Sequence, residues 1–274
     1  MDSASEAAIA TDTDEPVLYS LTAGLATITL NRPDKLNSLN AAMHERLRAL
    51  LTDIGSNPDV RALLIAAKGR AFCAGQDLNE RRSDSGQSRP DLGLTLEKNW
   101  NPLARALRYM RVPTVCAVNG VAAGAGVSIA LACDLVIAAR SASFVLSFSR
   151  LGLIPDAGAT YLLPRLVGEA RAMGIALLGD KISAEEAASV GMIWRQINDD
   201  DLPSYAQQIA RRLAQGPTLG LSMIKRAIKS SSANSFEDQL ELERSCQRQC
   251  GFSDDYREGV MAFIEKREPD YKGR

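Results

Sequence analysis

Apolar residues recur along the chain with two different spacings, and the spacing predicts where strands and helices lie. Between residues 17 and 30, Ala26, Ile28 and Leu30 alternate with other residues, which is typical of a strand in a hairpin. Residues 41–54 carry apolar side chains on one stripe, which is typical of an amphipathic helix. Further helices are predicted at 94–109, 161–166, 169–178, 184–190, 202–214, 218–230, 236–250 and 254–266. Because helices alone occupy the end of the chain, we expect an α/β core followed by a helical region.

The stretch from residue 115 to 160 predicts a site for proton transfer. The apolar strand Val115–Val118 leads through the small residues Gly124–Gly126 into a buried helix over 127–133. The first N–H groups of a helix have no partner inside it, and small side chains let an anionic oxygen approach them. Beyond the helix, Asp156 stands in an apolar, turn-rich segment. Donors for a developing negative charge and one acid/base group together form a minimal proton-transfer site.

Each of these features also has a purely structural interpretation. Glycines at a strand-to-helix junction more often allow close packing than catalysis. An aspartate followed by Ala-Gly, like Asp156, is more often an N-cap or turn residue. Phosphate-binding motifs do not match, because the run after Asn119 lacks both the lysine of a P-loop and the third glycine of a dinucleotide fingerprint.

Composition narrows the class of protein further. The 32 basic and 33 acidic residues nearly cancel, so nothing favours a nucleic-acid or membrane partner. No apolar run approaches the roughly 20 residues needed to cross a bilayer. The five cysteines are an odd number without regular spacing, which is typical of reduced thiols. We therefore expect a soluble, cytoplasmic protein without a metal site.

The only histidine of the chain and two polar segments give three further predictions. His44 lies on the predicted helix 41–54, where a surface position is the simplest expectation. A chain whose only histidine is a surface residue has no Ser-His-Asp or Cys-His nucleophile and no His-based metal site. Residues 1–16 are acidic and polar and predict a disordered tail. Residues 79–92 are rich in charge, Ser and Gly and predict a mobile flap.

Four separate motifs stand in the order and spacing of the crotonase (enoyl-CoA hydratase/isomerase) superfamily. They are NRPDKLNSLN at 31–40, FCAGQDL at 72–78, NGVAAGAG at 119–126 and GLIPDAG at 152–158. The resemblance implies an α/β fold of the ClpP/crotonase-like type, with a spiral of ββα units at 17–200 and a helical C-terminal oligomerisation region at 201–274. It also implies a homotrimer or homohexamer that acts on an acyl-CoA thioester. Coenzyme A is then part of the substrate, and no separate cofactor is expected.

The resemblance assigns roles to individual positions as well. It implies that backbone N–H groups of Gln76 and Ala125, which follow Gly75 and Gly124, hold the thioester oxygen. Asp156 matches the acid/base aspartate of the superfamily's isomerases. Preorganised donors of this kind contribute roughly 10²–10³ in rate each.

Two further positions depart from the hydratases of the superfamily, and both are expected in the substrate pocket. Hydratases use two glutamates to add water, whereas this chain has Ser128 and Phe148 at those places. Without a carboxylate pair to orient water, hydration is disfavoured and isomerisation is favoured. Phe148 would give an aromatic substrate an apolar wall, or would simply fill the core. For coenzyme A, the resemblance points to Lys35, Leu36, Ala74, Phe263 and Lys266, the last two often reaching a neighbouring subunit.

Longer local likeness narrows the expected reaction. Residues 148–156, 171–180, 191–194 and 255–260 resemble the members of the superfamily that serve bacterial phenylacetate degradation. Those members convert 2-(1,2-epoxy-1,2-dihydrophenyl)acetyl-CoA into oxepin-CoA and also move 3-enoyl-CoA double bonds to the 2-position. The alternatives are an enoyl-CoA hydratase and a non-catalytic RNA-binding or scaffold member of the fold. The near-neutral charge disfavours RNA binding.

Overall fold

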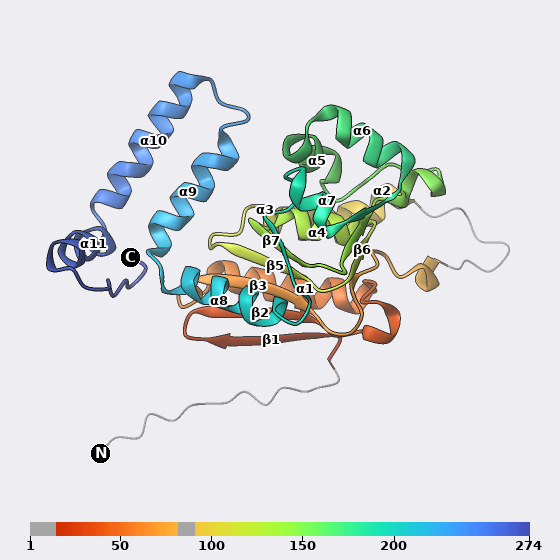
Figure 1. The fold of residues 1–274 in the computed structure, drawn as a ribbon, viewed down its shortest axis with the longest axis horizontal. Helices are drawn as coiled ribbons and strands as arrows, with labels where there is room; N and C mark the ends of the chain where they lie inside the picture. The colour runs from red at the N-terminus through yellow and green to blue at the C-terminus, as the bar shows by residue number, and fades with distance from the viewer. Residues whose placement is uncertain (1–14, 82–90) are drawn as a thin grey trace, which may run out of the picture.

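A six-stranded sheet forms the centre of the molecule (Figure 1). The computed structural model describes residues 15–81 and 91–274. The strands of this sheet, in spatial order, are β1 (Val17–Thr22), β2 (Leu25–Leu30), β3 (Ala62–Ala67), β5 (Thr114–Val118), β7 (Leu135–Ala139) and β10 (Arg195–Ile197). The first two strands form an antiparallel hairpin, and every other neighbouring pair is parallel. The predicted alternation holds in β2, where Ala26, Ile28 and Leu30 are buried.

A second sheet of four short strands lies beside the first. Its strands, in spatial order, are β4 (Ala71–Cys73), β6 (Val121–Ala123), β8 (Ser143–Val145) and β9 (Lys181–Ser183). Along the chain β3 leads to β4, β5 to β6 and β7 to β8, and each pair is followed by helix. This is the predicted spiral of ββα units. Strands of three residues are too short to show a period of two, so the sequence pattern did not predict them.

Helices cover both sheets. Their bounds are α1 (Ala41–Ser56), α2 (Leu92–Thr95), α3 (Asn101–Arg108), α4 (Ala125–Ala132), α5 (Ala159–Val167), α6 (Glu169–Leu178), α7 (Ala184–Ser189) and α8 (Leu202–Gln215). Short turns of other helix types are η1 (Pro33–Lys35), η2 (Leu78–Arg81), the π-helical η3 (Leu96–Trp100) and η4 (Ser147–Leu151). All eight residues of α4 are buried, which is why this helix shows no amphipathic stripe in the sequence.

The last three helices form an arm that projects from the rest of the molecule (Figure 1). The arm consists of α9 (Thr218–Ser230), α10 (Phe236–Gly251) and α11 (Asp254–Glu265). Helix α8 instead packs against β3 and β5 of the large sheet. The arm therefore begins after α8, which packs on the sheet. The predicted helical region at 201–274 includes both α8 and the arm, and its boundary at residue 200 stays a prediction.

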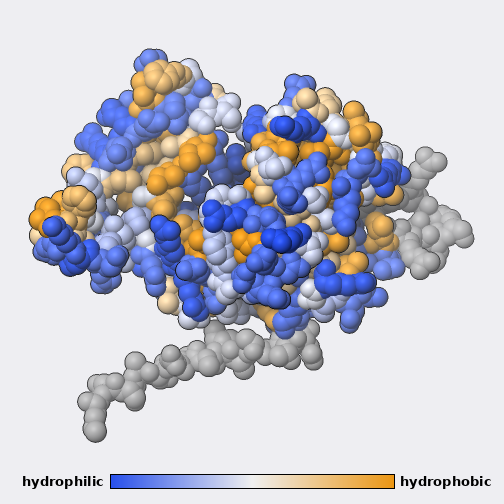
Figure 2. Space-filling model, in the orientation of Figure 1, coloured by the Kyte–Doolittle hydropathy of each residue, from blue (hydrophilic) through white to orange (hydrophobic). Residues whose placement is uncertain are grey.

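Two lysines of α9 join the arm to the body. The Nζ atoms of Lys225 and Lys229 lie 2.6 and 2.5 Å from the carboxylate of Asp134, at the start of β7. A cavity of about 570 Å³ lies between α9 and the body, lined by this ion pair and by apolar residues such as Leu162 and Ile228. Figure 2 shows the hollow, with apolar side chains along the α9 wall.

Parts of two predictions lie outside the described residues. The predicted tail at 1–16 is described only from residue 15, and the predicted flap at 79–92 only at its two ends. Within the described part of the chain, every helix is too short or too polar to cross a bilayer.

Candidate active site

Gln76 presents its backbone N–H on the side of the chain that faces a cavity. The N–H of Leu39 donates to the carbonyl of Gly75 over 2.7 Å, and the carbonyl of Leu39 accepts from the N–H of Asp77 over 3.0 Å. In a trans peptide the C=O and N–H point in opposite directions. Because the Gly75 carbonyl faces Leu39, the N–H of Gln76 points away from Leu39, and Gln76 lines the cavity.

Ala125 supplies a second N–H beside the first. It is the first residue of α4, so its N–H has no partner within the helix. Gly124 precedes it with φ +53° and ψ −127°, a backbone conformation that favours glycine. No backbone hydrogen bond among the described residues uses the N–H of Gln76 or of Ala125. Both donors are therefore available to a ligand.

The N–H groups of Gln76 and Ala125 are close because glycines without side chains, Gly75 and Gly126, stand where the two segments meet. A Cβ on Gly75 would lie 3.3 Å from the Ala125 nitrogen and 3.0 Å from the Ala123 oxygen. A Cβ on Gly126 would lie 2.2 Å from the Cys73 oxygen, which fixes how closely α4 approaches β4. The glycines thus serve close packing and, by the same contacts, bring the two N–H groups together.

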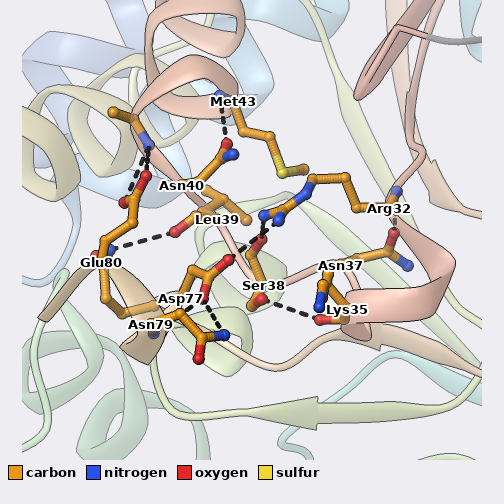
Figure 3. A network of polar contacts seen from close by, with 12 residues as sticks. Arg32, Lys35, Asn37, Ser38, Leu39, Asn40, Met43, Asp77, Asn79 and Glu80 are labelled. Carbon is orange, nitrogen blue, oxygen red and sulfur yellow. Dashed lines mark hydrogen bonds and ion pairs between the residues drawn. The ribbon is translucent and has the colours of Figure 1, made fainter. Parts of the chain in front are cut away.

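A polar network holds the Gln76 loop against the segment that follows β2 (Figure 3). Arg32 donates to the Ser38 carbonyl over 2.9 Å and to the Asp77 carboxylate over 3.1 Å. Burial raises the pKa of Asp77, but hydrogen bonds from Asn79 and the Arg32 guanidinium outweigh burial and hold this pKa below its usual value. The ionised carboxylate therefore keeps the loop in place at neutral pH.

Asp156 lies in a tight turn just before α5. The next residue, Ala157, has φ +50° and is buried, which is an unfavourable backbone conformation for a residue with a Cβ. The Asp156 carbonyl accepts from the Ser128 hydroxyl over 2.8 Å and from the Ala159 N–H over 3.0 Å. These bonds stabilise the turn and fix the main chain of Asp156 relative to α4.

One cavity of about 320 Å³ brings most of the predicted site residues together. Gln76, Ala125 and Asp156 all line it, as do Gly124 and Phe148. The other lining residues are Ala74, Leu78, Leu92, Leu96, Trp100, Ala123, Ser147, Leu151, Leu153 and Ile154. A cavity with two backbone donors, one carboxylate and otherwise mainly apolar walls can bind a polarised carbonyl and move a proton next to it.

The two positions that replace glutamates have different surroundings. Phe148 lines the cavity, and its ring tip would lie 3.7 Å from a Cβ on Gly124. Ser128 was predicted in the pocket, but it is fully buried behind the cavity wall and its hydroxyl points to the Asp156 main chain. The reason is that Ser128 lies on α4, all of which is packed inside the protein.

The residues predicted for coenzyme A divide into two groups. The Ala74 N–H donates to the Leu36 carbonyl over 3.0 Å, so the exposed Lys35 and its neighbour lie beside the cavity that Ala74 lines. Phe263 is on α11 and Lys266 directly follows this helix. Figure 1 places α11 at the far end of the arm, away from α2 and α4. The single chain therefore does not bring Phe263 and Lys266 to the cavity.

The expected surface position of His44 is wrong. The residue is 3 % exposed and packs edge-on against Trp100, with ring centroids 4.6 Å apart. Burial, helped by the charge of Arg48, lowers the pKa of His44 to about 4. His44 lies on the side of α1 that packs against η3. The spacing of apolar residues in α1 does not predict this contact, because it depends on where η3 lies.

Trp100 is the site residue that sequence reasoning missed. Its indole N–H donates to the side-chain oxygen of Gln76 over 2.9 Å, and its ring borders the cavity. It ends a π-helical turn, an irregularity that is frequent at functional sites. In the sequence the only signal is a tryptophan within a charged segment, which is equally typical of a core anchor.

Comparison with known proteins identifies the family to which this fold belongs. The model of the enoyl-CoA hydratase/isomerase family matches residues 20–274. The chain belongs to this family, and the predicted crotonase fold of α/β class is confirmed.

Individual relatives include both isomerases and hydratases. The chain is 53 % identical to the 1,2-epoxyphenylacetyl-CoA isomerase of Escherichia coli over 260 residues, which are 95 % of this chain and 99 % of the relative. It is 35 % identical to the 2,3-dehydroadipyl-CoA hydratase of Escherichia coli, over 90 % of this chain and 94 % of the relative. A crystal structure of a Mycobacterium abscessus protein assigned to this family superposes with a TM-score of 0.89 at 37 % identity, covering 94 % and 100 % of the two chains.

Proposed function

We propose that this protein is an isomerase of an acyl-CoA thioester, with 2-(1,2-epoxy-1,2-dihydrophenyl)acetyl-CoA as substrate and oxepin-CoA as product. The observation that carries the proposal is the single cavity lined by Asp156, Gln76 and Ala125. The similarity to an epoxyphenylacetyl-CoA isomerase supports the choice of substrate. Isomerisation of 3-enoyl-CoA to 2-enoyl-CoA uses the same groups and is expected as a second activity.

In the proposed mechanism Asp156 moves one proton. Its carboxylate removes a proton from the carbon next to the thioester, and the electron pair moves onto the thioester oxygen. The N–H groups of Gln76 and Ala125 stabilise this enolate oxygen. The proton then returns to another carbon, with ring rearrangement in the case of the epoxide. Substrate and product have the same atoms, so the step balances without a second reactant.

The wall residues favour isomerisation over hydration. Phe148 presents an aromatic face where a hydratase would place a glutamate, and this face excludes water and suits an aromatic acyl group. The buried Ser128 holds the Asp156 turn and does not reach the cavity. Among the described residues that line the pocket, Asp156 therefore provides the one carboxylate.

A substitution of Asp156 tests the proposal. In Asp156→Asn we expect exchange of the substrate's acidic C–H with deuterated water to fall by at least about 10³-fold, because the amide cannot accept the proton. Binding of the CoA ester, measured by calorimetry, should stay within a few-fold. Asp200→Asn, on the exposed surface, is the matched control and should keep wild-type exchange. Full activity of Asp156→Asn would end the proposal.

Hydration is the second candidate, because a 2,3-dehydroadipyl-CoA hydratase is among the relatives. Mass spectrometry separates the two functions when ring-epoxide, 3-enoyl and 2-enoyl CoA esters are compared side by side. An isomerase leaves the mass of its substrate unchanged, whereas a hydratase adds one water to a 2-enoyl ester. Rapid addition of water to crotonyl-CoA would favour the hydratase.

Coenzyme A would contact two copies of the chain under this proposal. Lys35, Leu36 and Ala74 lie beside the cavity of their own chain. Phe263, 85 % exposed, and Lys266 lie at the end of the arm, where they could serve the site of a neighbouring copy. The apolar hollow between α9 and the body supports assembly into a homotrimer or homohexamer, because apolar surface of this extent is unfavourable in water.

A further inference from the structure

Trp100 borders the cavity and also contacts the residue that supplies one of the two N–H donors. Its side chain is 1 % exposed at the end of η3. A buried indole N–H requires an acceptor, and here the acceptor is the side-chain oxygen of Gln76, 2.9 Å away. The indole N–H is therefore bonded to the side chain of Gln76, while the ring borders the cavity.

The side chain of Gln76 is held at both ends. While Trp100 donates to its oxygen, its Nε2 donates to the Leu39 carbonyl over 3.3 Å. Leu39 is the same residue that pairs with the peptide groups on either side of Gln76. Leu39 therefore binds both the side chain of Gln76 and the peptide groups on either side of it, while Trp100 binds the end of the side chain. Together these bonds restrain the position of the residue and the direction of its N–H.

The ring of Trp100 is itself held from behind. His44 packs edge-on against it, at an interplanar angle of 83°. Because its lowered pKa keeps His44 neutral, the imidazole adds an aromatic contact without placing a charge behind the ring. His44 on α1 therefore contacts Trp100 on η3, and Trp100 in turn contacts Gln76.

We propose that Trp100 is a positioning residue, which holds the Gln76 N–H in register with the Ala125 N–H. The inference rests on the proposed function, because it assigns a role within the same oxyanion site. A donor contributes to the rate only when its direction is set before the reaction, and a displacement of about 1 Å can cost roughly 10²-fold. Trp100 acts through Gln76 and does not itself exchange a proton with substrate.

Trp100→Phe tests the inference, because it keeps an aromatic side chain at the cavity wall and removes the N–H donor together with one ring of the indole. We expect kcat to fall roughly tenfold while KM changes by less than about twofold, since the lost alignment matters most in the transition state. Trp194→Phe is the matched control, because Trp194 is half exposed and stacks on Tyr205 at a distance from the cavity lining. This control should keep wild-type kcat.

A spectroscopic signal separates positioning from general support of the fold. Phenylacetyl-CoA with a ¹³C-labelled thioester carbonyl is the probe, because it lacks the epoxide and cannot rearrange. In the bound ester the oxyanion donors should move the carbonyl stretch to lower frequency. We expect a smaller shift in Trp100→Phe than in wild type and an unchanged shift in Trp194→Phe. A role in stability alone would reduce the folded fraction without moving the band of the bound ester.

Gln76→Met keeps the test decisive if Trp100→Phe folds poorly, because it removes the acceptor of the same hydrogen bond, keeps side-chain length and should lower kcat by a similar factor. Where both variants fold, Trp100→Phe should add almost no further loss in the Gln76→Met background. Additive losses, or a wild-type band and kcat in Trp100→Phe, would overturn the inference and leave the isomerase proposal standing. A wild-type protein that does not shift the carbonyl band would instead count against the proposed function itself.

Discussion

His44 illustrates how surroundings decide the chemistry of one residue. A histidine in water titrates near neutral pH, but burial against Trp100, together with the charge of Arg48, lowers its pKa to about 4. At the pH of a cell the ring is therefore neutral. It functions as an aromatic packing residue and offers the site no acid or base.

This lowered pKa predicts a loss of stability in mild acid. Between pH 6.5 and 4 the unfolded chain binds the His44 proton more readily than the folded chain, so the free energy of unfolding falls as pH drops through this window. From pH 7.5 to 5.5 the loss from this group is about 1.3 kcal/mol. His44→Phe should remove that part of the pH dependence in urea unfolding at the two pH values. Equal pH dependence in both proteins would contradict the prediction.

At the scale of elements, the closeness of α4 to β4 determines both packing and catalysis. Gly126→Ala would place a Cβ 2.2 Å from the Cys73 oxygen, so α4 must move away from the strand. We expect a loss of about 2 kcal/mol in stability and a fall in kcat, because Ala125 moves with the helix. Gly174→Ala in α6 is the control, since no atom lies within 4 Å of its Cβ, and it should gain up to about 1 kcal/mol. Thermal denaturation compares the two, and equal melting temperatures would contradict the argument.

At the scale of the whole molecule, the ion pair at Asp134 ties the arm to the body. The Lys225 and Lys229 side chains are only 9 % and 16 % exposed. Burial lowers the pKa of Lys225 to about 8, against the opposing attraction of Asp134. The lysine charges are therefore stable in this place only while the carboxylate is present.

Asp134→Asn should loosen the arm, because it leaves two largely buried ammonium groups without a counter-charge. We expect a loss of about 3 kcal/mol and faster limited proteolysis near residues 215–217, which join α8 to α9. Asp180→Asn is the matched control, because its pair with Arg150 is exposed and should contribute less than about 1 kcal/mol. Similar effects of the two substitutions on unfolding and cleavage would show that Asp134 does not anchor the arm.

The class of fold, the apolar faces of β2 and α1, and the four motifs that point to Gln76, Ala125 and Asp156 can all be predicted from the order of the residues. Such features are local, because the spacing of apolar residues indicates which face of a strand or helix is buried, and glycines indicate turns. Other features became visible only in the folded chain: Ser128 faces the Asp156 turn, His44 is buried, α8 packs on the sheet and Trp100 donates a hydrogen bond to Gln76. Those outcomes depend on how separate elements pack against one another, and the sequence of a single element carries no record of its partner's position.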